Sequence, residues 1–370
     1  MSFRIGKETV MEKLKVAVLG GTGMVGQRFV TLLADHPWYE IKIIAASPRS
    51  KGKTYEEAVS GRWAMEKPIP ENVKNIVLKD VSEVKEIASE VDFCFSAVDM
   101  TKEEIRAIEE EYALAETPVV SNNSAHRWTP DVPMIIPEIN ADHADIIPLQ
   151  KKRLGTTRGF IAVKPNCSIQ SYVPVLKAWE EFGPHNLTVT TYQAISGAGK
   201  TFESWPEMVG NIIPYIGGEE EKSEKEPLKI FGQIVGNEIV ASDAYHITCQ
   251  CVRVPVLYGH TAAVFVNLDK KVEKEVLIEK IRSYSGKAQE LDLPHAPKHF
   301  IQYLEEDNRP QVSEDVWFEY GMGVSIGRLR EDHIFDYKFI GLSHNTMRGA
   351  AGGAVECAEL LTKLGYISAK

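Results

Sequence analysis

The sequence is poor in cysteine, in basic charge and in long apolar runs. No run approaches the eighteen or so apolar residues that a membrane-spanning helix needs. The N-terminal segment has mixed charge and no apolar core, unlike a secretory signal peptide. Because the 370 residues carry a net charge of −10 at pH 7, they offer no overall basic field to nucleic acid or to an anionic membrane. We therefore predict a cytoplasmic protein with neither partner, in which any anionic substrate meets a local cluster of Arg and Lys.

The cysteines are scattered and odd in number, which argues against a disulfide framework. The five are Cys94, Cys167, Cys249, Cys251 and Cys357. Cys249 and Cys251 lie two positions apart in an expected strand and so face one side of it, but no second cysteine pair completes a zinc site. We interpret these two as buried neutral thiols and expect no metal.

The order of apolar runs predicts two kinds of sheet. Residues 14 to about 150 alternate between short apolar runs and helical patterns, which is typical of a parallel, doubly wound α/β sheet. Its expected strands are 14–19, 41–46, 92–97 and 118–121. One expected helix begins near residue 24 and another spans 102–115. From about residue 160, longer runs favour a mixed or antiparallel sheet with helices on one face. These runs are 187–195, 239–256, 262–268 and 324–328, followed by an expected helix over 345–364.

A glycine pattern follows the first expected strand and opens the first helix. Gly20-x-x-Gly23-x-x-Gly26 would let the backbone approach a pyrophosphate at the N-terminus of that helix. Thr22, Met24 and Val25 lie in the same turn. The strand–turn–helix context favours a dinucleotide site, and a tight structural turn is the alternative.

The end of the second expected strand indicates which dinucleotide binds. An NAD site usually places Asp or Glu there for the ribose hydroxyls. This chain instead has Ser47, Arg49 and Ser50, without an acid. That composition suits a 2′-phosphate and favours NADP, and the alternative is a solvated basic loop.

Cys167 is the candidate nucleophile. It lies in Pro165-Asn166-Cys167-Ser168, between the extended run 160–163 and a helical pattern over 172–182. Free N–H groups and the dipole of that helix would lower the pKa of the thiol and favour the thiolate. A buried structural cysteine is the alternative.

Other segments carry residues that are weak signals when taken singly. Gln193 and the small residues up to Gly199 could lie close to a ligand. His260, after a glycine, could exchange protons with a thiol near neutral pH. Arg127 could hold a phosphate or carboxylate in bidentate fashion, and Arg253 lies on an expected strand.

Together these motifs resemble aspartate-semialdehyde dehydrogenase, in the branch found in archaea, fungi and some bacteria. The resemblance extends from Lys15 to about Tyr366. Its specific motifs are the glycine turn 20–26, the segment 165–168, the run 193–199, the run 253–260 and the segment 344–352. Each motif alone is weak, whereas five in this order are specific.

The resemblance implies a role for each candidate residue. Cys167 forms a thioester with the substrate, His260 is the general acid and base, and Gln193 orients the acyl group. The implied substrate contacts are the carboxylate with Arg253, the ammonium with Glu219, and the phosphate with Arg127, Lys222 and nearby Asn123. We choose Glu219 over Glu220 and Glu221 because three residues separate it from Lys222, on one helical face. The expected NADP contacts are Gly20, Thr22, Gly23, Met24, Val25, Ser47, Arg49, Ser50, Ser96, Ser196, Gly197 and Asn345.

The implied reaction is the reversible, NADP-dependent reductive dephosphorylation of L-aspartyl 4-phosphate to L-aspartate 4-semialdehyde, in the biosynthesis of lysine, threonine and methionine. The implied fold resembles glyceraldehyde-3-phosphate dehydrogenase. A Rossmann-like domain comprises residues 1–160 and 345–370, and a catalytic and dimerisation domain comprises 161–344. A homodimer or homotetramer is expected.

Two departures from the family pattern leave alternatives open. Ile169 stands where Thr usually follows Cys-Ser, and Asp99 stands where a neutral residue is commoner. An acyl-CoA reductase of the malonyl-CoA type and N-acetyl-glutamyl-phosphate reductase are the nearest alternatives, although neither needs a Glu aimed at an ammonium. A non-catalytic NADP-binding sensor is the third, although it would be expected to lose Cys167 or His260.

Overall fold

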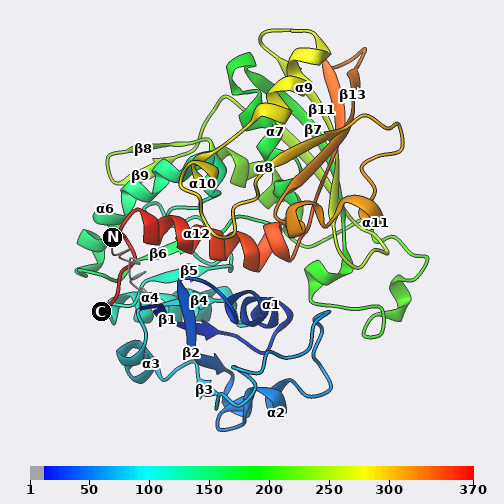
Figure 1. The fold of residues 1–370 in the computed structure, drawn as a ribbon. Coiled ribbons are helices and arrows are strands. Elements are labelled where there is room, and N and C mark those ends of the chain that lie inside the picture. The colour runs from blue at the N-terminus through cyan, green and yellow to red at the C-terminus, as the bar shows by residue number, and fades with distance from the viewer. Residues whose placement is uncertain (1–11) are drawn as a thin grey trace, which may run out of the picture.

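The computed structural model describes residues 12–370 and contains two six-stranded sheets (Figure 1). The first sheet is wholly parallel, in the order β3-β2-β1-β4-β5-β6. Its strands are β1 (Leu14–Leu19), β2 (Tyr39–Ala46), β3 (Lys79–Asp80), β4 (Phe93–Ser96), β5 (Val119–Ser121) and β6 (Ile161–Val163). The helices of this half are α1 (Met24–Leu33), α2 (Tyr55–Val59), α3 (Val84–Glu90), α4 (Lys102–Leu114), α5 (Pro137–Asn140) and α6 (Ile147–Leu154). The predicted doubly wound sheet is confirmed.

Local sequence explains where these elements begin. The inner residues of β1 are apolar and fully buried, as expected for a parallel strand covered on both faces. Thr101 caps α4, and the N–H of Thr101 in turn donates to Glu104. Thr54 and Glu57 form the same reciprocal cap on α2. Such caps satisfy N–H groups that would otherwise lack a partner in the first turn.

The second sheet is mixed, in the order β10-β7-β11-β14-β13-β12. Only the pairs β10/β7 and β12/β13 are parallel. Its strands are β7 (Pro184–Gln193), β10 (Ile247–Arg253), β11 (His260–Leu268), β12 (Ile301–Leu304), β13 (Val324–Glu331) and β14 (Tyr337–Ser343). The other elements are α7 (Val173–Ala178), α8 (Glu219–Ile230), the hairpin β8 (Gln233–Val235) with β9 (Glu238–Val240), α9 (Lys274–Ser283), α10 (Lys287–Glu290) and α11 (Val312–Asp315). The predicted mixed sheet is confirmed.

The C-terminal helix α12 (Gly352–Lys363) returns to the first sheet. It packs beside α1 and β5, and in Figure 1 it crosses the middle of the molecule in red. Its residues from Gly352 to Leu361 are buried. Within residues 12–370, every helix is too short or too polar to cross a bilayer.

Three predicted elements differ from the structure. The run 239–256 is two strands, β9 and β10, because β9 pairs with β8 in a separate two-stranded sheet. The helix expected over 172–182 is interrupted, with α7 between 3-10 turns at Ser168–Ser171 and Glu180–Phe182. The expected helix from Asn345 begins as a wide turn, Met347–Ala351, in which Ala350 leaves helical geometry (φ −142°, ψ −108°).

Candidate active site

Cys167 and His260 lie in contact between the two sheets. Cys167 ends the loop after β6, and His260 is the first residue of β11. The Sγ atom of Cys167 is 3.3 Å from Nε2 of His260. His260 is fully buried, whereas Cys167 is partly exposed. The structure therefore joins two residues that are 93 positions apart and that the sequence proposed as nucleophile and acid–base group.

The other ring nitrogen of His260 fixes the position of its proton. Nδ1 accepts the backbone N–H of Ala194 at 3.0 Å. A neutral ring that accepts at Nδ1 carries its proton on Nε2. This Nε2–H points at Cys167, so His260 is a hydrogen-bond donor to the sulfur and stabilises the thiolate when it forms.

The pKa values of this pair differ from the sequence-based expectation. Burial raises the pKa of the Cys167 thiol to about 11, aided by Glu219 and opposed by Lys164, Arg127 and Arg253. Burial also lowers the pKa of His260 to about 3. The expected lowering of the thiol pKa by a helix is wrong, because burial has the largest effect on the thiol and outweighs the nearby cations. The free enzyme thus holds a neutral thiol beside a neutral imidazole near pH 7.

Glu219 is the acid that faces the site from α8. Its carboxylate accepts from Lys222 Nζ at 2.8 Å and from Asn166 Nδ2 at 3.0 and 3.1 Å, and Gln193 Nε2 lies 3.3 Å away. Burial acts to raise the pKa of Glu219, but Lys222 and these donors hold it below its ordinary value. Glu219 is therefore an anion next to Cys167.

The neighbouring acids point elsewhere. Glu220 accepts the backbone N–H of Cys251 at 3.3 Å, and exposed Glu221 pairs with Lys225 at 2.8 Å. The choice of Glu219 therefore agrees with the geometry of the helix. Cys249 and Cys251 are buried free thiols with sulfur atoms 3.8 Å apart, as the sequence indicated.

Arg127 also lies at the site, where it forms an ion pair with a buried acid of α8. Its Nη1 donates to Glu226 at 2.9 Å, and its Nε donates to the carbonyl of Lys164 at 3.1 Å. The second oxygen of Glu226 accepts the backbone N–H of Asn166 at 2.6 Å. Glu226 therefore fixes both a predicted phosphate-binding side chain and the residue before Cys167.

A cavity of about 220 Å³ brings together eight of the predicted site residues. Its walls include Val25, Asn123, Arg127, Cys167, Ser196, Gly197, Lys222 and Asn345. Asn123 donates to Ser96 Oγ and to Glu109, each at 3.1 Å. Asn345 donates to Ser196 Oγ at 2.8 Å and accepts the N–H of Gly259 at 2.8 Å.

Glycines allow the close packing around the nucleophile. A Cβ on Gly349 would lie 2.8 Å from Cβ of Cys167, so the wide turn before α12 can touch the nucleophile only with glycine there. A Cβ on Gly197 would lie 3.0 Å from Nη1 of Arg253 and 3.2 Å from His260. Arg253 donates to the carbonyl of Ala194 at 2.6 Å. It thus braces the same residue whose N–H orients His260.

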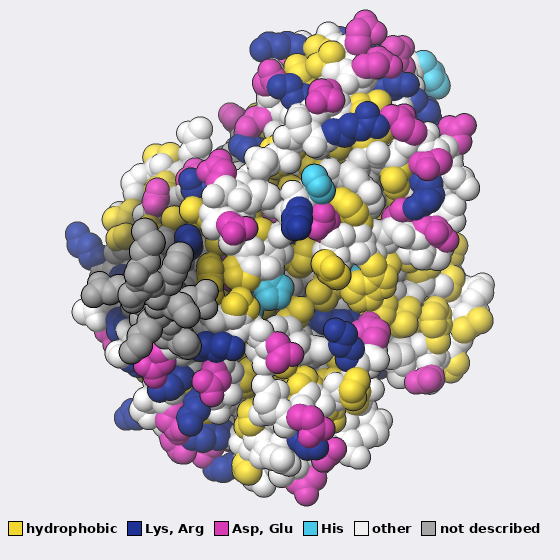
Figure 2. Space-filling view, viewed as in Figure 1, with side chains coloured by type: hydrophobic (Ala, Val, Ile, Leu, Met, Phe, Trp, Pro, Cys, Tyr) yellow, Lys and Arg dark blue, Asp and Glu magenta, His cyan; other side chains and the backbone are white. Residues whose placement is uncertain are grey.

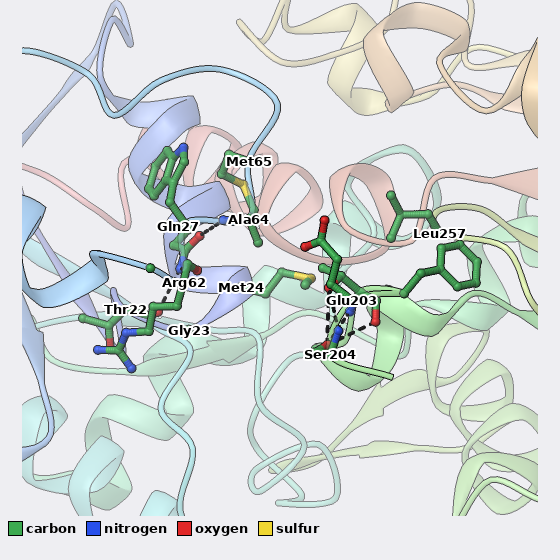
Figure 3. A pocket seen from close by; sticks show the side chains of 15 residues that line it. Thr22, Gly23, Met24, Gln27, Arg62, Ala64, Met65, Glu203, Ser204 and Leu257 are labelled. Atoms are coloured by element: carbon green, nitrogen blue, oxygen red, sulfur yellow. Dashed lines mark hydrogen bonds between the residues drawn. The ribbon is translucent and has the colours of Figure 1, made fainter. Parts of the chain in front are cut away.

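A larger cavity of about 850 Å³ lies at the glycine turn (Figure 3). Thr22, Gly23 and Met24 line it. No side chain of residues 12–370 caps the first turn of α1, and a Cβ on Gly23 would meet only the Gly20 carbonyl, at 3.8 Å. Uncapped N–H groups facing an open cavity fit a dinucleotide pyrophosphate. Gly20 has φ +80°, and a Cβ there would lie 2.2 Å from the carbonyl oxygen of Ala97.

The three residues chosen for the 2′-phosphate lie apart from both cavities. Ser47 precedes, and Arg49 and Ser50 belong to, a one-turn 3-10 helix after β2. Ser47 and Arg49 are exposed, whereas Ser50 is buried. None of the three lines either of the two cavities. Their contact with cofactor stays a prediction.

Within residues 12–370, one cluster has metal-ligand atoms close together: His36, His295 and Glu359, within 4.8 Å. Nδ1 of His36 accepts the N–H groups of Trp38 and Tyr39, so the neutral ring carries its proton on Nε2. That N–H donates to Glu359 at 2.8 Å, where a metal would have to bind. The cluster therefore fits a hydrogen-bonded group rather than a metal site.

Several residues of the site are not among those predicted from the sequence. Asn166, Glu226 and Lys164 are buried around Cys167, and burial lowers the pKa of Lys164 to about 7. Asn166 and Lys164 are next to the nucleophile in sequence, which was a usable signal. Glu226 follows Lys222 by four positions, which places it on the same face of α8.

Known proteins match nearly the whole chain. Models of the "Semialdehyde dehydrogenase, NAD binding domain" and the "Semialdehyde dehydrogenase, dimerisation domain" match residues 15–147 and 174–348. The aspartate-semialdehyde dehydrogenase of Archaeoglobus fulgidus is 39% identical over 351 residues, which is 95% of this chain and 98% of that protein. The Saccharomyces cerevisiae protein of the same name is 42% identical over 360 residues, 93% of this chain and 96% of that protein. This chain belongs to the aspartate-semialdehyde dehydrogenase family.

A solved structure supports the same conclusion at the level of the fold. The aspartate-semialdehyde dehydrogenase of Candida albicans, determined with NADP, superposes with a TM-score of 0.86 and 36% identity. The alignment covers 96% of this chain and all of that one. The family predicted from the five motifs is confirmed, with relatives from archaea and fungi.

Proposed function

We propose that this enzyme catalyses the reversible, NADP-dependent reductive dephosphorylation of L-aspartyl 4-phosphate to L-aspartate 4-semialdehyde, in lysine, threonine and methionine biosynthesis. The contact between Cys167 and His260 carries this proposal, because it sets a buried, fixed N–H donor against a thiol that lines a cavity together with Arg127 and Lys222. A nucleophile beside two cations fits a substrate that carries a phosphate leaving group.

The proposed roles follow from the charges around Cys167. The Cys167 thiol passes its proton to the phosphoryl oxygens of the substrate as its sulfur attacks the acyl carbon. A C–S bond forms, the bond from carbon to the phosphate oxygen breaks, and the phosphate leaves with that proton. The departing phosphate carries negative charge toward Arg127 and Lys222. Glu219 is an anion suited to the substrate ammonium, and Arg253 is suited to its carboxylate. Gln193 lies between Thr191 and Glu219 and orients the acyl group.

His260 acts on the sulfur at both ends of the reaction. Its Nε2–H stabilises the thiolate before attack and again when the C–S bond breaks to release the aldehyde. Bound NADPH supplies the hydride that reduces the thioester. Thr22, Gly23 and Met24 would hold the pyrophosphate, while Ser96, Ser196, Gly197 and Asn345 would form the nicotinamide end. The uncapped turn at α1 supports this arrangement.

The proposal includes a homodimer or homotetramer formed through the second sheet. Along β7 and β11, buried residues alternate with residues that are half-exposed or exposed. One face of this sheet therefore lacks a covering layer within the described chain. Its outward residues include Thr188, Thr190, Thr261, Ala263 and Phe265. The segment before α8 also exposes Val209, Ile212 and Tyr215 by 60–69%. The family model that matches residues 174–348 is described as a dimerisation domain, which supports assembly through this part of the chain.

We also propose the division into a cofactor domain (1–160 and 345–370) and a catalytic domain (161–344), of which residues 1–11 lie outside the described chain. The two separate sheets support it, except that β6 pairs with β5, which moves the boundary past Val163. A cytoplasmic location is part of the proposal, because a catalytic thiol must stay reduced.

Assays of NADPH formation test this function. The purified enzyme would be offered aspartate semialdehyde and NADP with phosphate, or with coenzyme A in its place, and Cys167→Ala would be the control. Turnover that requires phosphate and is lost in the variant, which still binds NADP, supports the proposal. Turnover only with coenzyme A would assign the enzyme to the acyl-CoA reductases. NADP binding without turnover in either assay would indicate a sensor.

A further inference from the structure

The wall of the large cavity opposite the catalytic domain is a loop that no motif indicated. The cavity lies between the start of α1, the segment Gly61–Met65 and the segment 199–204. Figure 3 shows Thr22, Gln27 and Arg62 together on one side of it, and Glu203, Ser204 and Leu257 on the other. We call residues 61–65 the cleft loop.

Gln27 fixes the cleft loop to the glycine turn. Its side chain is buried, and all of its polar atoms are paired. Nε2 donates to the carbonyls of Thr22 and Arg62, each at 3.0 Å, while Oε1 accepts the N–H of Ala64 at 2.8 Å. One amide therefore holds the glycine turn and the cleft loop at a set distance from each other.

Two further contacts secure the ends of the cleft loop. Tyr55, on α2 just before the loop, donates from its hydroxyl to the Gly21 carbonyl at 3.0 Å. Glu66, just after the loop, forms a bidentate pair with Arg28 of α1 at 2.8 and 3.0 Å. The loop is thus attached to the glycine turn and to α1 at three points, and it forms a fixed wall.

Arg62 supplies the positive charge of this cavity. It is the one cation among the fifteen described residues that line it. Its Nε and Nη2 donate to the carbonyl of Ala58, at 2.9 and 2.6 Å, and Nη1 has no partner within residues 12–370. In Figure 3 Arg62 lies on the same side of the cavity as Thr22. An arginine held by the end of α2, in the wall of the cavity that the uncapped turn of α1 also lines, is suited to a phosphate.

We propose that Arg62 binds a phosphate group of the dinucleotide and that Gln27 positions the cleft loop for this contact. The inference rests on the proposed NADP-dependent function. The dinucleotide offers two sources of this chemistry, the pyrophosphate and the 2′-phosphate, and binding measurements with NADPH and NADH separate them.

The test is equilibrium binding of NADPH and NADH, followed by nucleotide fluorescence, in the wild type, Arg62→Gln, Arg62→Lys and Arg49→Gln. Loss of one charge-assisted hydrogen bond is expected to weaken binding about tenfold in Arg62→Gln. Arg62→Lys should recover part of the affinity, because it keeps the charge. Weakening of both nucleotides assigns Arg62 to the pyrophosphate, whereas weakening of NADPH alone assigns it to the 2′-phosphate.

Two results would overturn the inference, and a third concerns the function. Affinities within twofold of the wild type for both nucleotides in Arg62→Gln would remove Arg62 from the site. So would an equal loss in Arg62→Lys that is independent of salt, which would indicate a structural role through Ala58. A wild-type enzyme that binds neither nucleotide would contradict the proposed function itself. Gln27→Leu should weaken NADPH binding with Arg62 still present.

Discussion

At the scale of single residues, the proton on Cys167 governs the chemistry of the free enzyme. A thiol pKa of about 11 predicts that alkylation by iodoacetamide accelerates about tenfold per pH unit from pH 7 to 10, because only the thiolate reacts. Peptide mapping after alkylation checks this, and Cys167→Ser is the control. A rate that levels off below pH 8 would contradict the burial argument and restore the thiolate expected from the sequence.

Glu226 is a second residue whose removal has a defined outcome. Glu226→Gln leaves the buried guanidinium of Arg127 without its anion and weakens the hold on the Asn166 N–H. We expect a loss of about 3 kcal/mol in the free energy of unfolding and at least a tenfold fall in kcat. Denaturant unfolding and steady-state kinetics measure both.

Glu221→Gln is the matched control on the same helix, because Glu221 is exposed and pairs only with Lys225. Its unfolding free energy should stay within about 0.5 kcal/mol of the wild type. If both variants behaved alike, Glu226 would have no special part in positioning the site.

At the scale of elements, β1, β2, β4, β5, α1 and α4 of the first half could be predicted. The short strand β3, the helices α2, α3, α5 and α6 and the irregular turns at the site could not. Strand β1 and helix α4 lie within one residue of their predicted bounds, because apolar burial and capping are local signals. The interruption after Cys167 is not a local signal. Ser168, Ser171 and Tyr172 bond to their own turn and to α8, so tertiary contacts decide that backbone.

The wide turn before α12 gives a prediction about backbone shape. Gly349→Ala would place a Cβ 2.8 Å from Cβ of Cys167. We expect kcat to fall at least tenfold, because a displacement of the nucleophile by a fraction of an ångström disturbs attack geometry. Gly217→Ala is the control, since its Cβ would meet only the Tyr215 hydroxyl, at 3.9 Å. Unchanged kcat in Gly349→Ala, with folding intact, would show that the turn is free to move.

At the scale of the whole molecule, buried neutral histidines make stability depend on pH. Burial lowers the pKa of both His260 and His344 to about 3, against an ordinary value of 6.5. As pH falls below 6.5, the unfolded chain takes up these protons and the folded protein does not. Stability should therefore fall by about 1.4 kcal/mol per pH unit for each histidine between pH 6.5 and 5.

Urea unfolding across this range measures the effect. His260→Asn should reduce the slope by the contribution of one proton, whatever its effect on stability at pH 7. A slope that is the same in the variant and the wild type would show that His260 is protonated in the folded enzyme.

One part of the site can be inferred from motifs in the sequence, and another part depends on the fold of the whole chain. The residues Cys167, His260 and Glu219 carry chemistry that a motif displays, and their order matched one family. Glu226 acts only because α8 places it beside Arg127, and Arg62 lines the large cavity only because the cleft loop places it there. The raised pKa of Cys167 likewise depends on burial between two sheets, which no short motif encodes.

Acylation of Cys167 is the central claim, and the mass of its peptide tests it most directly. The enzyme would be incubated with aspartate semialdehyde and NADP without phosphate, quenched in acid and digested. We predict one aspartyl group on the Cys167 peptide, formed together with NADPH, and its loss when phosphate is added before the quench. NADPH formation with an unmodified Cys167, or with the group on another residue, would contradict the account.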